Sequence, residues 1–163
     1  MMTIAQIMEK MIAFSEGNIH DITHLSCVWT YAKTIGELEG LDGETQFILE
    51  VAAITHDIAC PLCRKKYGNT NGSYQEQEGD PLVREFLADT GMTAAQIDRV
   101  AYLVGHHHSP AQIDGIDYQI LIEADYIVNA SESGYSKQVI RTFMEHTMKT
   151  AAGIRLTKTV FGV

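Results

Sequence analysis

The sequence contains little proline, little cysteine and few basic residues. Of its 163 residues only 3 are proline and 3 are cysteine, and 12 lysines and arginines face 21 aspartates and glutamates. The formal net charge of −9 argues against nucleic acid as a partner, because nucleic-acid binding depends on a basic surface. An odd number of cysteines predicts reduced thiols rather than a disulfide framework, and therefore a cytoplasmic protein.

The sequence also lacks a long apolar run and a targeting segment. No stretch approaches the roughly 20 apolar residues that a membrane-spanning helix needs, so no membrane partner is expected. The first residues, MMTIAQIMEKMIAFSEG, hold Glu9 and Lys10 inside their apolar pattern and carry no cleavage-site signature, which argues against a signal peptide. With 45% apolar residues we expect one domain over residues 1–163, and a homo-oligomer is left open.

Helical periodicity dominates the chain, and no segment alternates as a strand would. We therefore predict an all-α, single-domain bundle of about six to eight helices, near residues 3–14, 19–39, 44–57, 80–91, 93–108, 117–131 and 136–151. The glycine- and asparagine-rich stretch 60–79 predicts a long loop, after which Asp80-Pro81 starts a helix. Thr93 and Gln96 predict a capping box, and the tail 153–163 is expected to pack back onto the body.

Metal-capable side chains interrupt the apolar stripes of four helices. They are His24 in DITHLSCV, the pair His56-Asp57 in AAITHDIA, Asp125 in LIEADYIV, and the run His106–His108 at the end of a helix. Each alone is more often a core residue, a helix cap or an exposed acid. Together, two inward carboxylates with few basic residues nearby need a cation, and neutral imidazoles complete its shell. Mixed nitrogen and oxygen ligands suit Mn, Fe, Co, Ni or Zn.

The three blocks DITHLSCV, AAITHDIA and LIEADYIV, in this order, resemble the HD-domain superfamily of metal-dependent phosphohydrolases. The signature of that superfamily is a histidine, an adjacent His-Asp pair and a later aspartate, and the resemblance covers about residues 18–131. It implies a helical bundle and hydrolysis of a phosphate ester, often a nucleotide. It also implies a divalent transition metal held by His24, His56, Asp57 and Asp125.

The resemblance leaves the number of metals open. Two-metal members carry extra histidines between the His-Asp pair and the last aspartate. Where the first would lie, this chain has Gln75, Glu76 and Glu78; where the second would lie, it has His106 and His107. Either one metal binds, or His106 and an oxygen of Glu76 or Glu78 help to hold a second.

A further departure concerns the catalytic acid. Nucleotidase-like and alarmone-hydrolase-like branches place a glutamate three residues after the HD aspartate, and this chain has Cys60 there. We expect Asp57 to bind metal and orient the nucleophile, and Glu76 or Glu78 to act as general acid or base, because their segment follows the metal site.

The densest basic cluster follows the His-Asp pair. Arg64, Lys65 and Lys66 are candidates for holding substrate phosphate, as is His107, although a solvated loop explains the three cations equally well. The sequence thus predicts a hydrolase that acts on a small phosphorylated molecule, with a nucleotide favoured.

Two other functions are kept as alternatives. A non-catalytic metal-binding or ligand-sensing domain would explain the missing glutamate and histidine. A redox role for the CPLC segment, Cys60–Cys63, is disfavoured because the strand-helix context of such motifs is absent.

Overall fold

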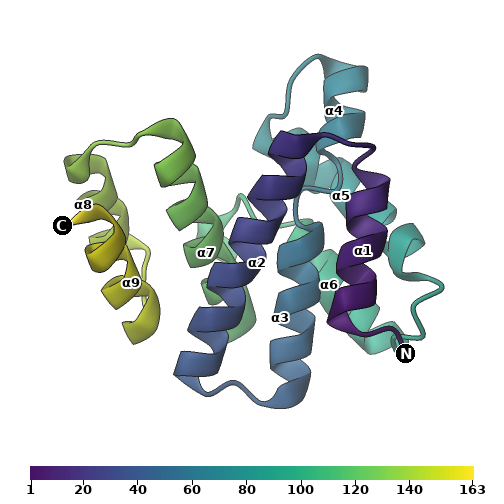
Figure 1. Cartoon of the computed structure of the whole chain (residues 1–163), viewed down its shortest axis with the longest axis horizontal. Coiled ribbons are helices and arrows are strands. Elements are labelled where there is room, and N and C mark those ends of the chain that lie inside the picture. The colour runs from purple at the N-terminus through teal and green to yellow at the C-terminus, as the bar shows by residue number, and fades with distance from the viewer.

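All 163 residues are described by the computed structural model, and its regular structure is helical throughout (Figure 1). The elements are α1 (Ile4–Phe14), α2 (Ile19–Glu39), α3 (Gly43–Thr55), α4 (Cys60–Tyr67), α5 (Gly72–Leu87), α6 (Ala94–Val104), a short 3₁₀ turn (Pro110–Gln112), α7 (Ile116–Ser133), α8 (Lys137–His146) and α9 (Ala151–Phe161). The predicted all-α class is confirmed.

Helices α2, α3 and α7 form the centre of the bundle, and each contacts the other two. Helix α3 also contacts α1 and α6, so it is covered on several sides. This explains why every residue from Leu49 to His56 is buried and why the segment shows no amphipathic stripe. By length and composition residues 43–67 would suffice to cross a membrane, but 67% of their most apolar window is buried inside the fold.

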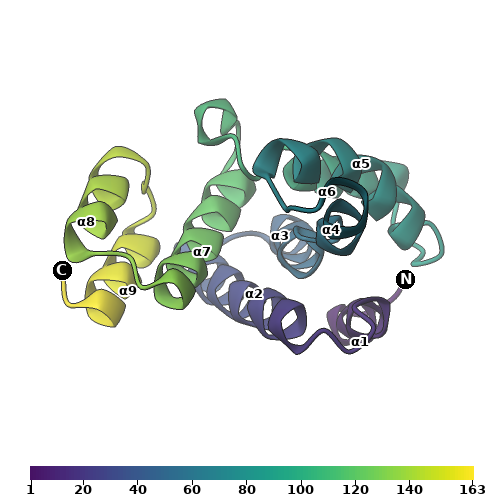
Figure 2. The same cartoon turned by 90° about the horizontal axis from the view of Figure 1, so that it is seen from above.

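The C-terminal helices α8 and α9 lie beside α7, at the end of the molecule opposite the N-terminus (Figures 1 and 2). Glu123 of α7 attaches them. Its fully buried carboxylate accepts hydrogen bonds from the backbone N–H groups of Lys149 and Thr150, at 2.7 and 3.1 Å, and from the Thr150 hydroxyl. These groups form the N-terminus of α9, where a negative charge is favoured. The tail therefore packs back as predicted, as a helix.

The long loop predicted over residues 60–79 is wrong. The segment forms α4 and the first half of α5, joined by only a few residues. Pro61 lies in the first turn of α4, where its missing N–H costs nothing, and Gly68 ends that helix with φ 73°. Gly79 lies inside α5 because of close packing: a Cβ there would lie 2.9 Å from Cγ1 of Val104 in α6.

The predicted helix start at Asp80-Pro81 is wrong as well, because Pro81 lies inside α5. The predicted helix 136–151 is too long. Helix α8 ends at His146, and a separate helix, α9, begins at Ala151 with Thr150 as its N-cap. By contrast α2 has the predicted ends, with Gly40 closing it at φ 75°, and the Thr93–Gln96 capping box is present.

Candidate metal centre

Five side chains from four parts of the chain converge inside the bundle. His24 comes from α2, His56 and Asp57 from the turn that ends α3, His107 from the turn that ends α6, and Asp125 from α7. His24, His56, His107 and Asp125 are buried, and the Asp57 side chain is 26% exposed. The carboxylate of Asp57 therefore connects the buried cluster with the surface.

The nitrogen and oxygen atoms of this cluster surround one point. Nε2 of His24 lies 3.2 Å from Nε2 of His56, 3.5 Å from Oδ2 of Asp57 and 3.2 Å from Oδ1 of Asp125. Nε2 of His56 lies 3.5 Å from both of these oxygens. Ligand atoms bound at about 2.0–2.1 Å to one tetrahedral ion lie roughly 3.3–3.4 Å apart, so the spacing suits a shared cation.

The histidine tautomers follow from the hydrogen bonds on the far side of each ring. Nδ1 of His56 lies 2.8 Å from the carbonyl oxygen of Ala53, and Nδ1 of His107 lies 2.8 Å from that of Val104. Nδ1 of His24 lies 3.0 Å from a carboxylate oxygen of Glu132. Each partner only accepts, so each Nδ1 carries the proton and donates it. In the neutral rings all three Nε2 atoms therefore point lone pairs into the cluster, the arrangement that metal-binding histidines use.

The cluster needs a cation, either a proton or a metal, between its nitrogen and oxygen atoms. Two imidazole lone pairs 3.2 Å apart repel each other unless a proton or a metal lies between them. Nε2 of His107 is buried without a hydrogen-bond partner, at 3.5 Å from Oδ1 of Asp57. That distance is too long for a hydrogen bond but ordinary for two ligands of one ion. These residues therefore fit a divalent metal.

The ionisation of the cluster indicates the same need. Burial lowers the pKa of His56, but the Asp57 and Asp125 carboxylates outweigh burial and raise the pKa to about 9. Burial raises the pKa of Asp125, yet its contacts with His24 and His56 hold the pKa well below the usual value. Without a cation the two carboxylates would draw protons onto the imidazoles, and a metal that binds here displaces those protons.

A second group of ligand atoms shares Asp57. Asp57, His107 and His108 offer three atoms close enough for one ion. The His108 ring lies against Gly72, where an added Cβ would approach ring atoms to 2.8 Å, so the glycine makes room for it. Gln75 lines a surface hollow together with Asp57 and His108, and its buried Oε1 has no hydrogen-bond partner. This half of the cluster offers a carboxylate, two imidazoles and an amide oxygen.

Comparison with known proteins agrees with this geometry. A family model described as HD domain matches residues 21–131, which hold every member of the cluster. The chain belongs to the HD-domain family. No curated protein and no solved structure matches the chain. HD domains as a superfamily are metal-dependent phosphohydrolases that bind divalent metals.

The histidine at the end of α6 that joins the cluster of this HD domain is His107. His106, predicted as a metal ligand, turns away: its ring stacks on Tyr102 at 4.2 Å, and its Nδ1 lies 2.7 Å from the Tyr102 carbonyl oxygen. The reason is that α6 ends at Val104, so the side chains after it no longer follow the helical stripe. His107, predicted to contact phosphate or to bind metal, lies among the metal-capable groups.

The predicted acid/base residues do not face the cluster. Glu76 accepts hydrogen bonds from the His108 N–H and the Ser109 hydroxyl, at 3.0 and 2.8 Å, and so holds the turn after α6. Glu78 lies 2.6 Å from both Lys66 and the Tyr67 hydroxyl, and joins α4 to α5. These contacts follow from the helix that replaces the predicted loop.

The hollow over the cluster has a volume of about 170 Å³ and is mostly polar. Among the three predicted basic residues only Arg64 lines it, where it pairs with Asp21. Lys66 is held by Glu78, and Lys65 is exposed. Asp57 and Gln75 line the hollow as well, so Arg64 is the basic residue that shares the hollow with candidate metal ligands.

Asp21 and Glu132 were not predicted from the sequence as site residues. His20, Asp21, Asn129 and Glu132 line the hollow, and Asn129 Nδ2 donates to Oδ1 of Asp125 at 2.8 Å. A usable signal existed for the last two, because Asn129 and Glu132 follow Asp125 by four and seven residues and so share its face of α7.

The family position of the catalytic glutamate holds a thiol in this structure. Cys60 lines the hollow, and burial, with the negative charges of Asp57 and Asp21, raises the pKa of its thiol strongly. A thiol with a raised pKa is a poor substitute for a carboxylate base.

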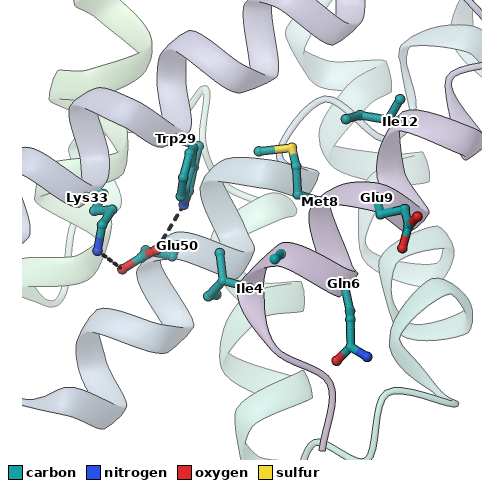
Figure 3. Close-up of a pocket in the computed structure, with 9 residues that line it drawn as sticks. Ile4, Gln6, Met8, Glu9, Ile12, Trp29, Lys33 and Glu50 are labelled. Atoms are coloured by element: carbon teal, nitrogen blue, oxygen red, sulfur yellow. Dashed lines mark hydrogen bonds and ion pairs between the residues drawn. The ribbon is translucent and has the colours of Figure 1, made fainter.

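The largest groove of the molecule lies away from this cluster, between α1 and the neighbouring parts of α2 and α3 (Figure 3). It has a volume of about 840 Å³ and is lined mainly by apolar side chains. Its buried acid, Glu50, accepts from the Trp29 indole at 2.9 Å and pairs with Lys33 at 3.5 Å. The metal-capable groups converge elsewhere, and this groove contains none of them.

Proposed function

We propose that this HD domain hydrolyses a small phosphate monoester, using a divalent transition metal held by His24, His56, Asp57 and Asp125. The observation that carries the proposal is the convergence of histidine lone pairs and two carboxylates beneath a polar hollow that one arginine lines. When bound, the metal supplies Lewis acidity and lowers the pKa of a water ligand toward neutrality.

The chain's own residues would bind and orient the phosphate. Arg64 offers a planar pair of N–H donors that suits phosphate oxygens, and its present partner Asp21 is an anion that a phosphate can replace. Asp57, at the border of the cluster and the hollow, would accept a hydrogen bond from the attacking water. Glu132 would keep the lone pair of His24 pointed inward.

The leaving oxygen needs a proton, and His20 is the residue that we assign to this step. It lines the hollow, its side chain is 76% exposed, and an imidazole can give and take protons near neutral pH. This assignment replaces Glu76 and Glu78, which lie outside the hollow.

The cysteines Cys27, Cys60 and Cys63 are free, which supports a cytoplasmic location.

The first test is metal content and phosphatase activity in the wild type and in Asp57→Ala. We expect about one or two metal equivalents by elemental analysis, with turnover of phosphomonoesters including nucleotides after loading with Mn or Ni. Asp57→Ala should lose the metal and the activity but keep its helical circular-dichroism spectrum. Glu145→Gln, at an exposed position of α8, is the matched control.

The alternative is a ligand-sensing HD domain without turnover, which the presence of Cys60 at the family's acid position favours. Wild-type protein that binds metal through Asp57 but hydrolyses no phosphate ester would support the alternative. Full metal content in Asp57→Ala would contradict both.

A further inference from the structure

A second hollow adjoins the metal centre on the side of α7 and α8. It has a volume of about 220 Å³, and it shares His108, Asp125 and Asn129 with the hollow over the cluster. Each hollow alone is smaller than the roughly 300 Å³ at which small-molecule sites begin. Because three residues line both hollows, the hollows are adjacent, and a ligand with its charged end at the metal centre has the second hollow beside it.

The remaining wall of the second hollow is apolar and largely aromatic. Besides His107, it consists of Pro110, Ile122, Tyr126, Tyr135 and Phe143. The Tyr126 and Phe143 rings are stacked, with centroids 3.5 Å apart and planes 1° from parallel, and the Tyr135 ring lies 5.9 Å from Tyr126. Tyr135 is 41% exposed, so its ring is available to a ligand. Flat rings bind to such surfaces by stacking and by burial of apolar area.

The charges of the second hollow limit what it can take. No lysine or arginine lines it, and its acid is Asp125, a candidate metal ligand. A second phosphate group would therefore find no cation there. Asn129 donates one N–H to Asp125. Its amide oxygen and second N–H remain available to the edge of an uncharged polar ring.

Two of the three aromatic rings of this wall lie outside the family match. Tyr135 and Phe143 lie after residue 131, where the match ends, and both belong to the segment that Glu123 holds against α7. The C-terminal helices thus add a feature to the metal centre that the HD match does not contain.

We propose that this aromatic hollow binds a flat, uncharged ring in the alcohol part of the substrate, so that the substrate is a monophosphate ester carrying such a ring. The proposal rests on the proposed function for the position of the phosphate. A nucleoside monophosphate and a simple arylalkyl phosphate share this chemistry.

The test compares esters that differ only in ring shape. Benzyl phosphate and cyclohexylmethyl phosphate have closely similar leaving alcohols, but only the first has a flat ring. On the metal-loaded wild type we expect kcat/KM for benzyl phosphate to be at least about fivefold higher, the lower end of what one stacking contact contributes. Adenosine and thymidine 5′-monophosphates, compared with ribose 5-phosphate, show whether a nucleobase is the better ring.

Variants of Tyr135 separate stacking from general effects. Tyr135→Ala should abolish the preference for the flat ring, while Tyr135→Phe, which keeps the ring, should retain it. Val139→Ala is the matched control, because Val139 is also exposed and apolar, lies in α8 and does not line this hollow. An equal preference in wild type and Tyr135→Ala would overturn the proposal and leave the hydrolase function standing.

Binding of a ligand that cannot be hydrolysed separates the proposed ring site from the proposed hydrolase function. Benzylphosphonate cannot be hydrolysed, and we expect calorimetry to give tighter binding for it than for cyclohexylmethylphosphonate, with the difference lost in Tyr135→Ala. If this holds while no ester is hydrolysed, the ring site stands and the hydrolase function fails. If neither phosphonate binds better than the other, the ring site is refuted whatever the activity.

Discussion

The two inward histidines that follow helix ends share one local geometry. His56 and His107 each come three residues after a core residue, Ala53 or Val104, and each bonds that residue's carbonyl through Nδ1. Such carbonyls have no partner inside their own helix, so the imidazole satisfies them and its Nε2 then points inward. This bond distinguishes His107 from His106, whose Nδ1 lies 2.7 Å from the carbonyl oxygen of Tyr102, four residues before it.

The roles of His107 and His106 can be separated by single substitutions. His107→Ala removes a buried nitrogen 3.5 Å from Asp57, so we expect lower metal content or at least tenfold weaker Mn²⁺ binding. His106→Ala should leave metal binding unchanged, because that ring faces Tyr102. Elemental analysis and calorimetric titration measure both. Loss of metal in His106→Ala alone would mean that the sequence-based assignment was the better one.

Glu132 is a positioning residue for His24. Its carboxylate accepts a hydrogen bond from Nδ1 of His24 at 3.0 Å. Glu132→Ala should therefore weaken metal binding by about 10–100-fold without removing a ligand. Glu132→Gln keeps an accepting oxygen and should recover most of the affinity. The d–d spectrum of the Co²⁺-loaded protein reports the ligand set independently of activity, and an unchanged affinity in Glu132→Ala would refute the role.

At the scale of elements, α5 shows how composition misled the prediction of a loop. Glycine and proline usually break helices, but Gly79 lies where α5 approaches α6, and the helix continues through Pro81. The contact with α6 stabilises a helix that local propensity would not favour, as tertiary packing often does. The partner in that contact, Val104, lies outside residues 60–79, so no pattern within those residues predicts it.

Gly79→Ala tests this explanation by the sign of its effect. In an exposed helix interior the change would stabilise the protein by up to about 1 kcal/mol. Here the added Cβ would lie 2.9 Å from Cγ1 of Val104, so we expect the free energy of unfolding to fall by about 1–3 kcal/mol. Urea denaturation followed by circular dichroism gives the value. A gain in stability would show that α5 and α6 are not packed this closely.

At the scale of the whole molecule, the candidate metal joins segments that are distant in sequence. Its ligands come from α2, α7 and the turns after α3 and α6. A metal that binds only the folded state stabilises it in proportion to the logarithm of metal concentration over Kd. Removal of the metal should therefore loosen several helices at once.

Chelation measures this linkage. We expect EDTA to lower the Tm of the metal-loaded wild type by several degrees, since about 1 kcal/mol corresponds to roughly 2–4 °C for a chain of this size. Added Mn²⁺ should restore the Tm, and Asp57→Ala should respond to neither treatment. If EDTA removes the metal but leaves the Tm of the wild type unchanged, the metal does not link these helices.

The class of the fold and four residues of the cluster were predictable from the order of the amino acids alone. Helical periodicity extends over many residues and survives local errors, and His24, His56, Asp57 and Asp125 are recognisable because charge on an apolar stripe is costly. Their order along the chain added the family, and the match over residues 21–131 agrees with it.

The tertiary structure decided what depends on contacts between distant segments. It put His107 rather than His106 in the cluster, Arg64 rather than Lys65 or Lys66 at the hollow, and the rings of Tyr135 and Phe143 in a hollow with Asp125. To foresee the position of His107, the end of α6 would have to be predicted to within one residue. Packing between helices sets the positions of Arg64 and of the aromatic rings. Periodicity tells which face of a helix is buried, but only the packed bundle decides which side chains meet there.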